Sequence, residues 1–146
     1  MNHNLPVDQR VLEIAKKKAM VVQAQYPDDV ILAADTVVVL GQNLLGKPTS
    51  KEEARHMLHS LSGSTHEVKT AVVLLGSTAT EWVETSLVTF RPLTTEDIEQ
   101  YLDSGEWLDK AGAYAIQGLA GQFVTSLTGS YTNVMGLPIE QIKGLI

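Results

Sequence analysis

The chain has 146 residues, of which 44% are hydrophobic and 19% charged, a composition typical of one soluble globular domain large enough to close a core. Its formal net charge of −6 argues against a broad surface for nucleic acid or for an anionic membrane, but a few converging lysines can still bind a small anion. The absence of cysteine excludes disulfides, thiolate metal sites and cysteine nucleophiles, and it suits a cytoplasmic location.

Apolar periodicity and the turn signals between periodic segments predict the elements in chain order. Asp8 is the predicted N-cap of the first helix, Ser50 with Glu53 forms a capping-box pattern before the second, and Thr94 or Thr95 caps the third. Strands mixed with helices indicate an α/β fold with helices on both faces of a sheet. The predicted helices cover 8–25, 50–61, about 94–102 and a last one from 137, and the predicted strands cover 30–34, 37–40, 66–75, 82–90 and 122–127.

Asp35 is a residue that local structure does not explain. It interrupts the apolar run 30–40, which is too short to span a bilayer, and aspartate is depleted in strands. A buried carboxylate is costly unless it is paired, hydrogen-bonded or bound to a metal. Two interpretations carry similar weight: Asp35-Thr36 marks a bulge where the carboxylate accepts from nearby backbone N–H groups, or Asp35 has a functional role.

Two lysines and one glycine-rich segment are further candidates for binding an anion. Lys18 follows Ile14 by four residues and so projects onto the apolar stripe of its helix, where the common outcome is an ammonium that snorkels to water. Lys47 lies in a Gly-Lys-Pro loop, although a solvated loop lysine is the default there, and the glycine and Ser/Thr of a P-loop are absent. The small residues of 109–118 let a backbone approach a ligand closely, or simply form a turn-rich connection.

Six short segments occur in an order and at spacings that are more specific than any one of them. They are Ile14-Ala15-Lys16-Lys17-Lys18-Ala19, Ala34-Asp35-Thr36, Gly46-Lys47-Pro48, Leu61-Ser62-Gly63, 109–118, and Gly129-Ser130-Tyr131 with Val134-Met135-Gly136-Leu137-Pro138. Together they resemble the Maf family of nucleoside triphosphate pyrophosphatases, in its dTTP/UTP branch, across nearly the whole chain. Ala34 departs from the pattern, because a glycine is usual before this Asp-Thr pair.

The resemblance implies an α/β domain over 1–146 with a mixed sheet flanked by helices, related to the inosine-triphosphate pyrophosphatases, with two lobes and a central cleft. It implies cleavage of dTTP or UTP, with modified pyrimidine nucleotides as further candidates, to the monophosphate and pyrophosphate. The implied cofactor is a divalent cation, Mg²⁺ or Mn²⁺. A house-cleaning role in the cytoplasm, a homodimer, and neither nucleic-acid nor membrane partners are expected.

Carried across by motif, the resemblance assigns five residues. Asp35 is the general base and a metal ligand, Lys18 and Lys47 bind phosphate, and Thr36 and Gln117 set specificity. A carboxylate beside a metal can orient and deprotonate water, and lysine suits phosphate as a compact charge. The Gln117 amide can donate to O4 and accept from N3–H of uracil or thymine, whereas the methyl-GTP branch has glutamate at the matching place.

One part of the family pattern has no counterpart in this sequence. Family members open with a strand, a Ser-x-Ser-Pro-Arg-Arg loop and a segment with a metal-associated glutamate, so the resemblance predicts an N-terminally incomplete domain. We therefore expect weak turnover and self-association from this chain alone. Two alternatives stay open: a non-catalytic Maf-like protein that binds nucleotide or is associated with cell division, and a purine-directed pyrophosphatase, which Gln117 disfavours.

Overall fold

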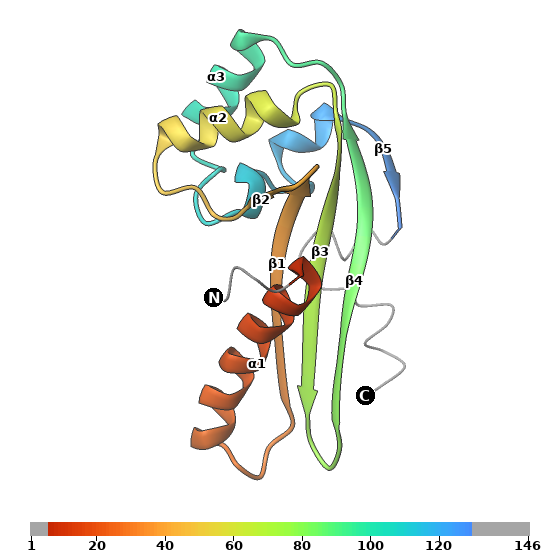
Figure 1. Ribbon diagram of the computed structural model, residues 1–146. Helices are drawn as coiled ribbons and strands as arrows, with labels where there is room; N and C mark the ends of the chain where they lie inside the picture. The colour runs from red at the N-terminus through yellow and green to blue at the C-terminus, as the bar shows by residue number, and fades with distance from the viewer. Residues whose placement is uncertain (1–5, 130–146) are drawn as a thin grey trace.

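One long, twisted antiparallel sheet carries the fold in the computed structural model, which describes residues 6–129 (Figure 1). Its strand order is β2-β1-β3-β4-β5, and every pair of neighbours is antiparallel. The strands are β1 (Ile31–Leu40), β2 (Asn43–Leu45), β3 (Thr65–Leu75), β4 (Ala79–Phe90) and β5 (Val124–Thr128). The helices are α1 (Val7–Gln25), α2 (Lys51–Leu61) and α3 (Thr95–Asp103), with short 3₁₀ segments η1 (Ala111–Ala113) and η2 (Leu119–Phe123). No helix within residues 6–129 is long and apolar enough to cross a membrane.

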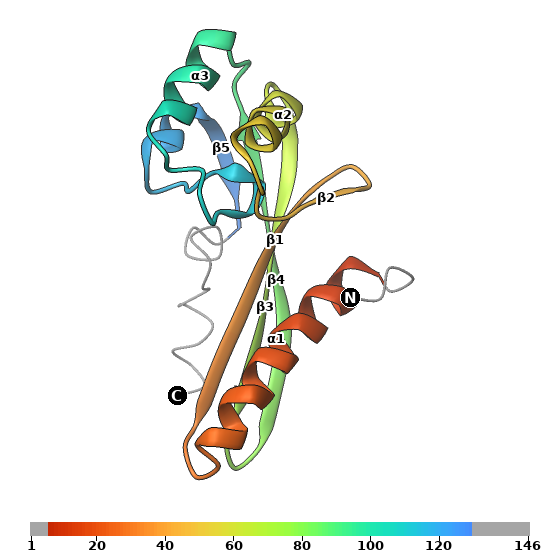
Figure 2. The same cartoon turned by 90° about the vertical axis from the view of Figure 1, so that its left-hand side faces the viewer.

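Two hydrophobic cores form on opposite faces of this sheet, because successive side chains of a strand point to opposite sides. In β1, Val37 and Val39 pack with the buried residues of α1, whereas Val38 packs with those of α2 and α3. Figure 2 shows α1 along the lower half of the sheet and α2 and α3 at its upper end. The α/β class, the helices on both faces and the two lobes are thus confirmed; the parallel pairing of a mixed sheet does not occur within residues 6–129.

The first helix differs at its start from the prediction. Pro6 is its N-cap, so Asp8 lies inside the first turn and the prediction of Asp8 as N-cap is wrong. A carboxylate there still stabilises the helix, because the N-terminal end carries partial positive charge. Val22, near the C-terminal end of the helix, is 42% exposed. The buried stripe consists of Val11, Ala15 and Ala19, whose small alanines let the helix approach the sheet closely.

The two later helices begin at predicted caps. Ser50 Oγ accepts from the Glu53 N–H at 3.1 Å, but the Glu53 carboxylate bonds Thr49, so only half of the predicted capping box forms. Thr94 caps α3, and its side chain and that of Asp97 complete a reciprocal capping box. These local patterns fix where each helix starts. The buried faces of α2 and α3 then pack into the upper core, the one that contains Val38.

The strand that carries Asp35 is continuous. Asp35 pairs with Ala71 and Thr36 with Thr70 in unbroken register, so both the bulge interpretation and the division of the strand at this point are wrong. The Asp35 carboxylate takes its partner, Lys18, from α1 and not from a bulged backbone.

Three elements near the ends of predicted segments differ from the prediction or lie outside the described residues. The short strand β2 follows β1 after a turn at 41–42 and was not predicted. The strand β5 starts at Val124, because the two residues before it belong to η2. The helix predicted from 137 lies outside the described residues.

Candidate active site

A cavity of about 280 Å³ opens beside the middle of β1, between α1 and the segment 109–117. Its volume lies near the lower end of the roughly 300–1,000 Å³ typical of small-molecule sites. Every residue that the sequence singled out as a site residue lines it: Lys18, Asp35, Thr36, Lys47 and Gln117. Residues from a helix, a strand and two loops therefore meet at one place, although up to about a hundred positions separate them in the sequence.

Asp35 is held by Lys18 across the gap between β1 and α1. The Lys18 ammonium donates to Asp35 Oδ1 at 2.7 Å, and the side chains are 50% and 16% exposed, respectively. Asp35 has the same orientation as Val37, which faces α1, because strand side chains alternate. The ion pair compensates the partly buried carboxylate, whose burial alone would be costly. Lys18 thus reaches an anionic group at the cavity wall instead of snorkelling away from the protein.

Thr36 lies on the other face of β1 and is positioned by β3. Its Oγ1 lies 2.9 Å from Thr70 Oγ1, the directly opposite residue in the neighbouring strand. Because β2 pairs with β1 only from Val38 onward, no strand within residues 6–129 covers the outer edge of β1 beside Asp35. The cavity can therefore be reached by side chains from both faces of the sheet at this edge.

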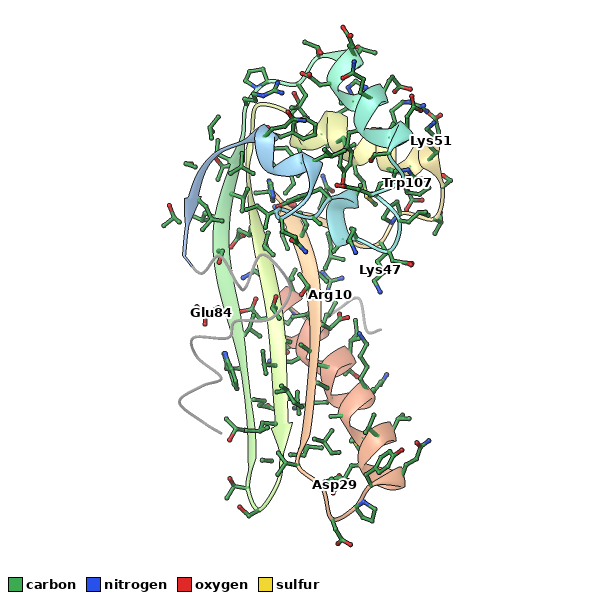
Figure 3. All side chains as sticks on the ribbon, turned by 180° about the vertical axis from the view of Figure 1, so that it is seen from behind. Arg10, Asp29, Lys47, Lys51, Glu84 and Trp107 are labelled. Atoms are coloured by element: carbon green, nitrogen blue, oxygen red, sulfur yellow. The ribbon has the colours of Figure 1, made fainter. Side chains whose placement is uncertain are left out.

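Lys47 sits on a loop that a backbone hydrogen bond ties to the opposite wall. The Gly46 carbonyl accepts from the Gly112 N–H at 3.0 Å, which joins the loop after β2 to the 109–118 segment. Pro48 is buried next to it, while Lys47 itself is exposed. Figure 3 shows Lys47 on the side of the upper lobe that faces α1. The ammonium is therefore presented at the cavity from an anchored backbone.

The segment 109–118 has an unusual backbone that is clamped onto the upper core. Asp109, Gly112 and Ala113 have φ angles of 59°, 69° and 72°, in the left-handed region. For a non-glycine residue this costs roughly 1–2 kcal/mol, so the surroundings must enforce it. The Tyr101 hydroxyl donates to the Ala113 carbonyl at 2.9 Å, and a Cβ on Gly112 would come within 2.8 Å of Val38. Contacts on both sides thus fix this wall.

Two buried aromatic groups support the cavity: Tyr114 lines it, and His66 contacts Tyr114 from within the core. The Tyr114 hydroxyl and His66 Nε2 are hydrogen-bonded at 2.6 Å, and both rings meet Phe90 edge to face. His66 is 1% exposed, and burial lowers its pKa to about 4, so the imidazole is neutral at pH 7. Burial raises the pKa of Tyr114. Both groups are uncharged at neutral pH, and they support the cavity without adding charge to it.

Sequence reasoning missed two charged residues of the site. Asp109 and Lys110 line the cavity beside the predicted residues. They were part of the singled-out segment, but residue chemistry alone did not indicate which of its side chains face a ligand. With them, three ammonium groups and two carboxylates border the cavity. This local excess of positive charge, within a chain of net charge −6, suits a polyanionic ligand.

The carboxylates of the cavity fit a cation that is shared with a substrate. No group of three or more His, Asp or Glu residues that could hold a metal occurs within residues 6–129. Mg²⁺, however, is commonly bound by one or two carboxylates together with phosphate oxygens and water. Asp35 and Asp109 supply carboxylate oxygens, the hard ligands that Mg²⁺ and Mn²⁺ prefer.

Comparison with known proteins gives consistent similarities along the chain. The family model described as Maf-like protein matches residues 2–146. A dTTP/UTP pyrophosphatase of Pyrococcus abyssi is 48% identical over 139 residues, which cover 94% of this chain and 74% of that protein. One of Halalkalibacterium halodurans is 50% identical over 135 residues (92% and 71%), and one of Shigella boydii serotype 4 is 49% identical over 140 residues (94% and 71%).

Proposed function

The chain belongs to the Maf family, and we propose that it hydrolyses dTTP and UTP to the nucleoside monophosphate and pyrophosphate. The observation that carries the proposal is the single cavity in which all five motif-assigned residues meet. The relatives named as dTTP/UTP pyrophosphatases support the reaction and the pyrimidine preference. In the cell this reaction has a house-cleaning role, which includes modified pyrimidine nucleotides.

In the proposed mechanism, Asp35 accepts the proton of the attacking water. Water adds to the α-phosphorus, the bond from this phosphorus to the bridging oxygen breaks, and pyrophosphate leaves with the bond electrons. Lys18 and Lys47 bind phosphate oxygens and compensate their charge. Asp35 and Asp109 would hold a divalent cation, which would supply further charge neutralisation at the phosphates. Because Lys18 contacts Asp35 at 2.7 Å, the lysine also orients the base.

Gln117 selects the base in the proposed mechanism, at the wall of the cavity that it lines. The Gln117 side chain is exposed there, and its amide offers one donor group and one acceptor. Uracil and thymine present the complementary O4 and N3–H, so one amide satisfies both. Thr36, whose hydroxyl lies against that of Thr70, adds a hydroxyl to the cavity from β1, on the face opposite to Asp35.

The test is Asp35→Asn, which keeps the side-chain volume and removes the base. We expect turnover of dTTP and UTP to fall by about 10²–10⁴-fold, the typical contribution of general-base catalysis, with an unchanged melting temperature. Pyrophosphate release with Mg²⁺ or Mn²⁺ measures it. The matched control is Asp29→Asn, an exposed aspartate in the turn that precedes β1 (Figure 3). Full activity of Asp35→Asn at saturating metal would exclude Asp35 as the base.

The homodimer, the cytoplasmic location and the lack of nucleic-acid or membrane partners complete the proposal. The sequence resemblance supports the homodimer, and the net charge of −6 supports the lack of polyanionic partners. Light scattering measures the oligomeric state directly.

A further inference from the structure

Glu106 reaches from the segment after α3 to the loop that carries Gln117. Its Oε2 accepts from the Leu119 backbone N–H at 2.8 Å, which closes a stretch of thirteen positions. The Glu106 backbone is itself anchored, because its N–H donates to Ser104 Oγ at 3.2 Å. A second cavity, of about 340 Å³, is lined by both Glu106 and Gln117, and it shares Gln117 with the first cavity. Glu106 therefore lies close to the loop that carries the proposed base-selecting residue.

Gly118 shows how closely the carboxylate packs on this loop. A Cβ at Gly118 would come within 2.3 Å of Glu106 Oε2. The φ of Gly118 is −100°, which other residues adopt, so a side chain here would displace the Glu106 carboxylate without straining the backbone. The Glu106 carboxylate thus packs against Gly118 and accepts from the Leu119 N–H, at the two residues that follow Gln117.

Nothing else in the described residues directs the Gln117 side chain. Its amide makes no hydrogen bond to the protein within residues 6–129, and the residue is exposed. The backbone therefore decides where the side chain begins, and so which part of the cavity the amide can reach. That backbone is set by two turns, in which the Gly118 N–H donates to the Ala115 carbonyl and the Gly121 N–H to the Gly118 carbonyl, and by the Glu106 carboxylate.

We propose that Glu106 is a positioning residue for base recognition, which holds the 117–119 backbone so that the Gln117 amide meets the pyrimidine. It acts through Gln117 and does not touch the substrate. The inference rests on the proposed function, because pyrimidine preference is its main readout. A charge-assisted hydrogen bond to a backbone N–H is among the stronger ones, which makes a single carboxylate sufficient for this role.

The first experiment compares Glu106→Ala with Glu106→Gln, by the ratio of kcat/KM for UTP to that for GTP. Glu106→Ala lowers this ratio on the order of tenfold, mainly through a higher KM for UTP, because a misplaced amide leaves polar groups of the base unpaired. Glu106→Gln retains an acceptor oxygen at the same reach and restores most of the ratio. Glu96→Ala, an exposed α3 carboxylate that accepts only from Gln100 in its own helix, is the matched control and leaves the ratio unchanged.

Double variants separate positioning from mere stabilisation. Gln117→Ala alone lowers the ratio, and adding Glu106→Ala lowers it no further if Glu106 acts through Gln117. Gly118→Ala is harmful in the wild-type chain and less so beside Glu106→Ala, because the 2.3 Å clash is then gone. A lower melting temperature with an unchanged UTP/GTP ratio in Glu106→Ala, or additive losses with Gln117→Ala, would overturn the inference.

A nucleotide-free measurement distinguishes this inference from the proposed function. Exchange of the Leu119 amide hydrogen accelerates in Glu106→Ala and stays slow in Glu106→Gln, because only the alanine removes its acceptor. If the wild-type chain does not hydrolyse dTTP or UTP, the proposed function fails, whatever this amide does. If the wild type prefers UTP and the Leu119 amide exchanges equally in all variants, the proposed function stands and the Glu106 inference fails.

Discussion

At Asp35 two requirements act on one carboxylate, since a base must be ionised and accessible while a partly buried charge must be compensated. Lys18 meets the second requirement at 2.7 Å and, being 50% exposed, does not close the carboxylate off from water. Because water reaches the half-exposed Lys18 and screens the pair, the pair contributes little to stability, typically about 0–1 kcal/mol. In the proposed mechanism its value lies in the site, where one ammonium serves both the base and the phosphate.

Lys18→Ala tests this division between stability and function. We expect the KM for UTP to rise by roughly 10–100-fold, the range that corresponds to a hydrogen bond to a charged group, with a small change in melting temperature. Lys17→Ala removes the adjacent exposed lysine, which does not line the cavity, and should leave the KM unchanged. Equal KM values for the two variants would show that Lys18 does not bind the phosphates.

At the scale of elements, the wall formed by 109–118 depends on Gly112 for two separate reasons. Its φ of 69° disfavours any side chain, and a Cβ would meet Val38 at 2.8 Å. Its N–H also holds the Gly46 carbonyl and thereby the Lys47 loop. A side chain at this position would therefore disturb both Val38 in the upper core and the Lys47 loop.

Gly112→Ala separates these effects when it is compared with Gly41→Ala. Gly41 has a similar φ of 61°, but nothing lies within 4 Å of its added Cβ. We expect Gly41→Ala to cost about 1–2 kcal/mol from backbone strain alone, and Gly112→Ala to cost about 1–3 kcal/mol more from overpacking, with reduced turnover. Urea denaturation and pyrophosphate release measure the two quantities. Equal destabilisation would mean that Val38 moves aside without cost.

The elements themselves were largely predictable, because helix caps and apolar periodicity are local properties of the sequence. Ser50 and Thr94 cap their helices as predicted. Asp35 was recognisable as an anomaly, but its partner was not, because the Lys18 contact depends on how α1 packs against β1. The role of Glu106 was equally hidden, since its acceptor contact with Leu119 exists only after the intervening loop has folded back.

At the scale of the whole molecule, buried His66 couples stability to pH. Burial lowers its pKa to about 4 from 6.5, so between these values the unfolded chain binds more protons than the folded one. The contribution of His66 to stability is therefore fully present above pH 6.5 and is lost as the pH falls toward 4. The loss from this group is on the order of 3 kcal/mol.

His66→Phe tests the coupling, because phenylalanine keeps a ring among the aromatic residues but binds no proton. We expect the free energy of unfolding to fall less between pH 7 and about pH 4.5 in this variant than in the wild type. The lost Tyr114 hydrogen bond lowers its stability at both pH values alike. His59→Asn, an exposed control, should keep the wild-type pH dependence. An unchanged dependence in His66→Phe would assign it to other groups.

The strands β1, β3 and β4 each contribute side chains to both hydrophobic cores. Turning one lobe against the other would require the ladder hydrogen bonds of all three strands to rearrange together, and such sheets do not provide a hinge. The width of the cavity is consequently fixed by the backbone. Admission of a nucleotide then depends on the rotation of exposed side chains such as Lys18, Lys47 and Gln117, which takes picoseconds to nanoseconds, and not on the slower closure of domains.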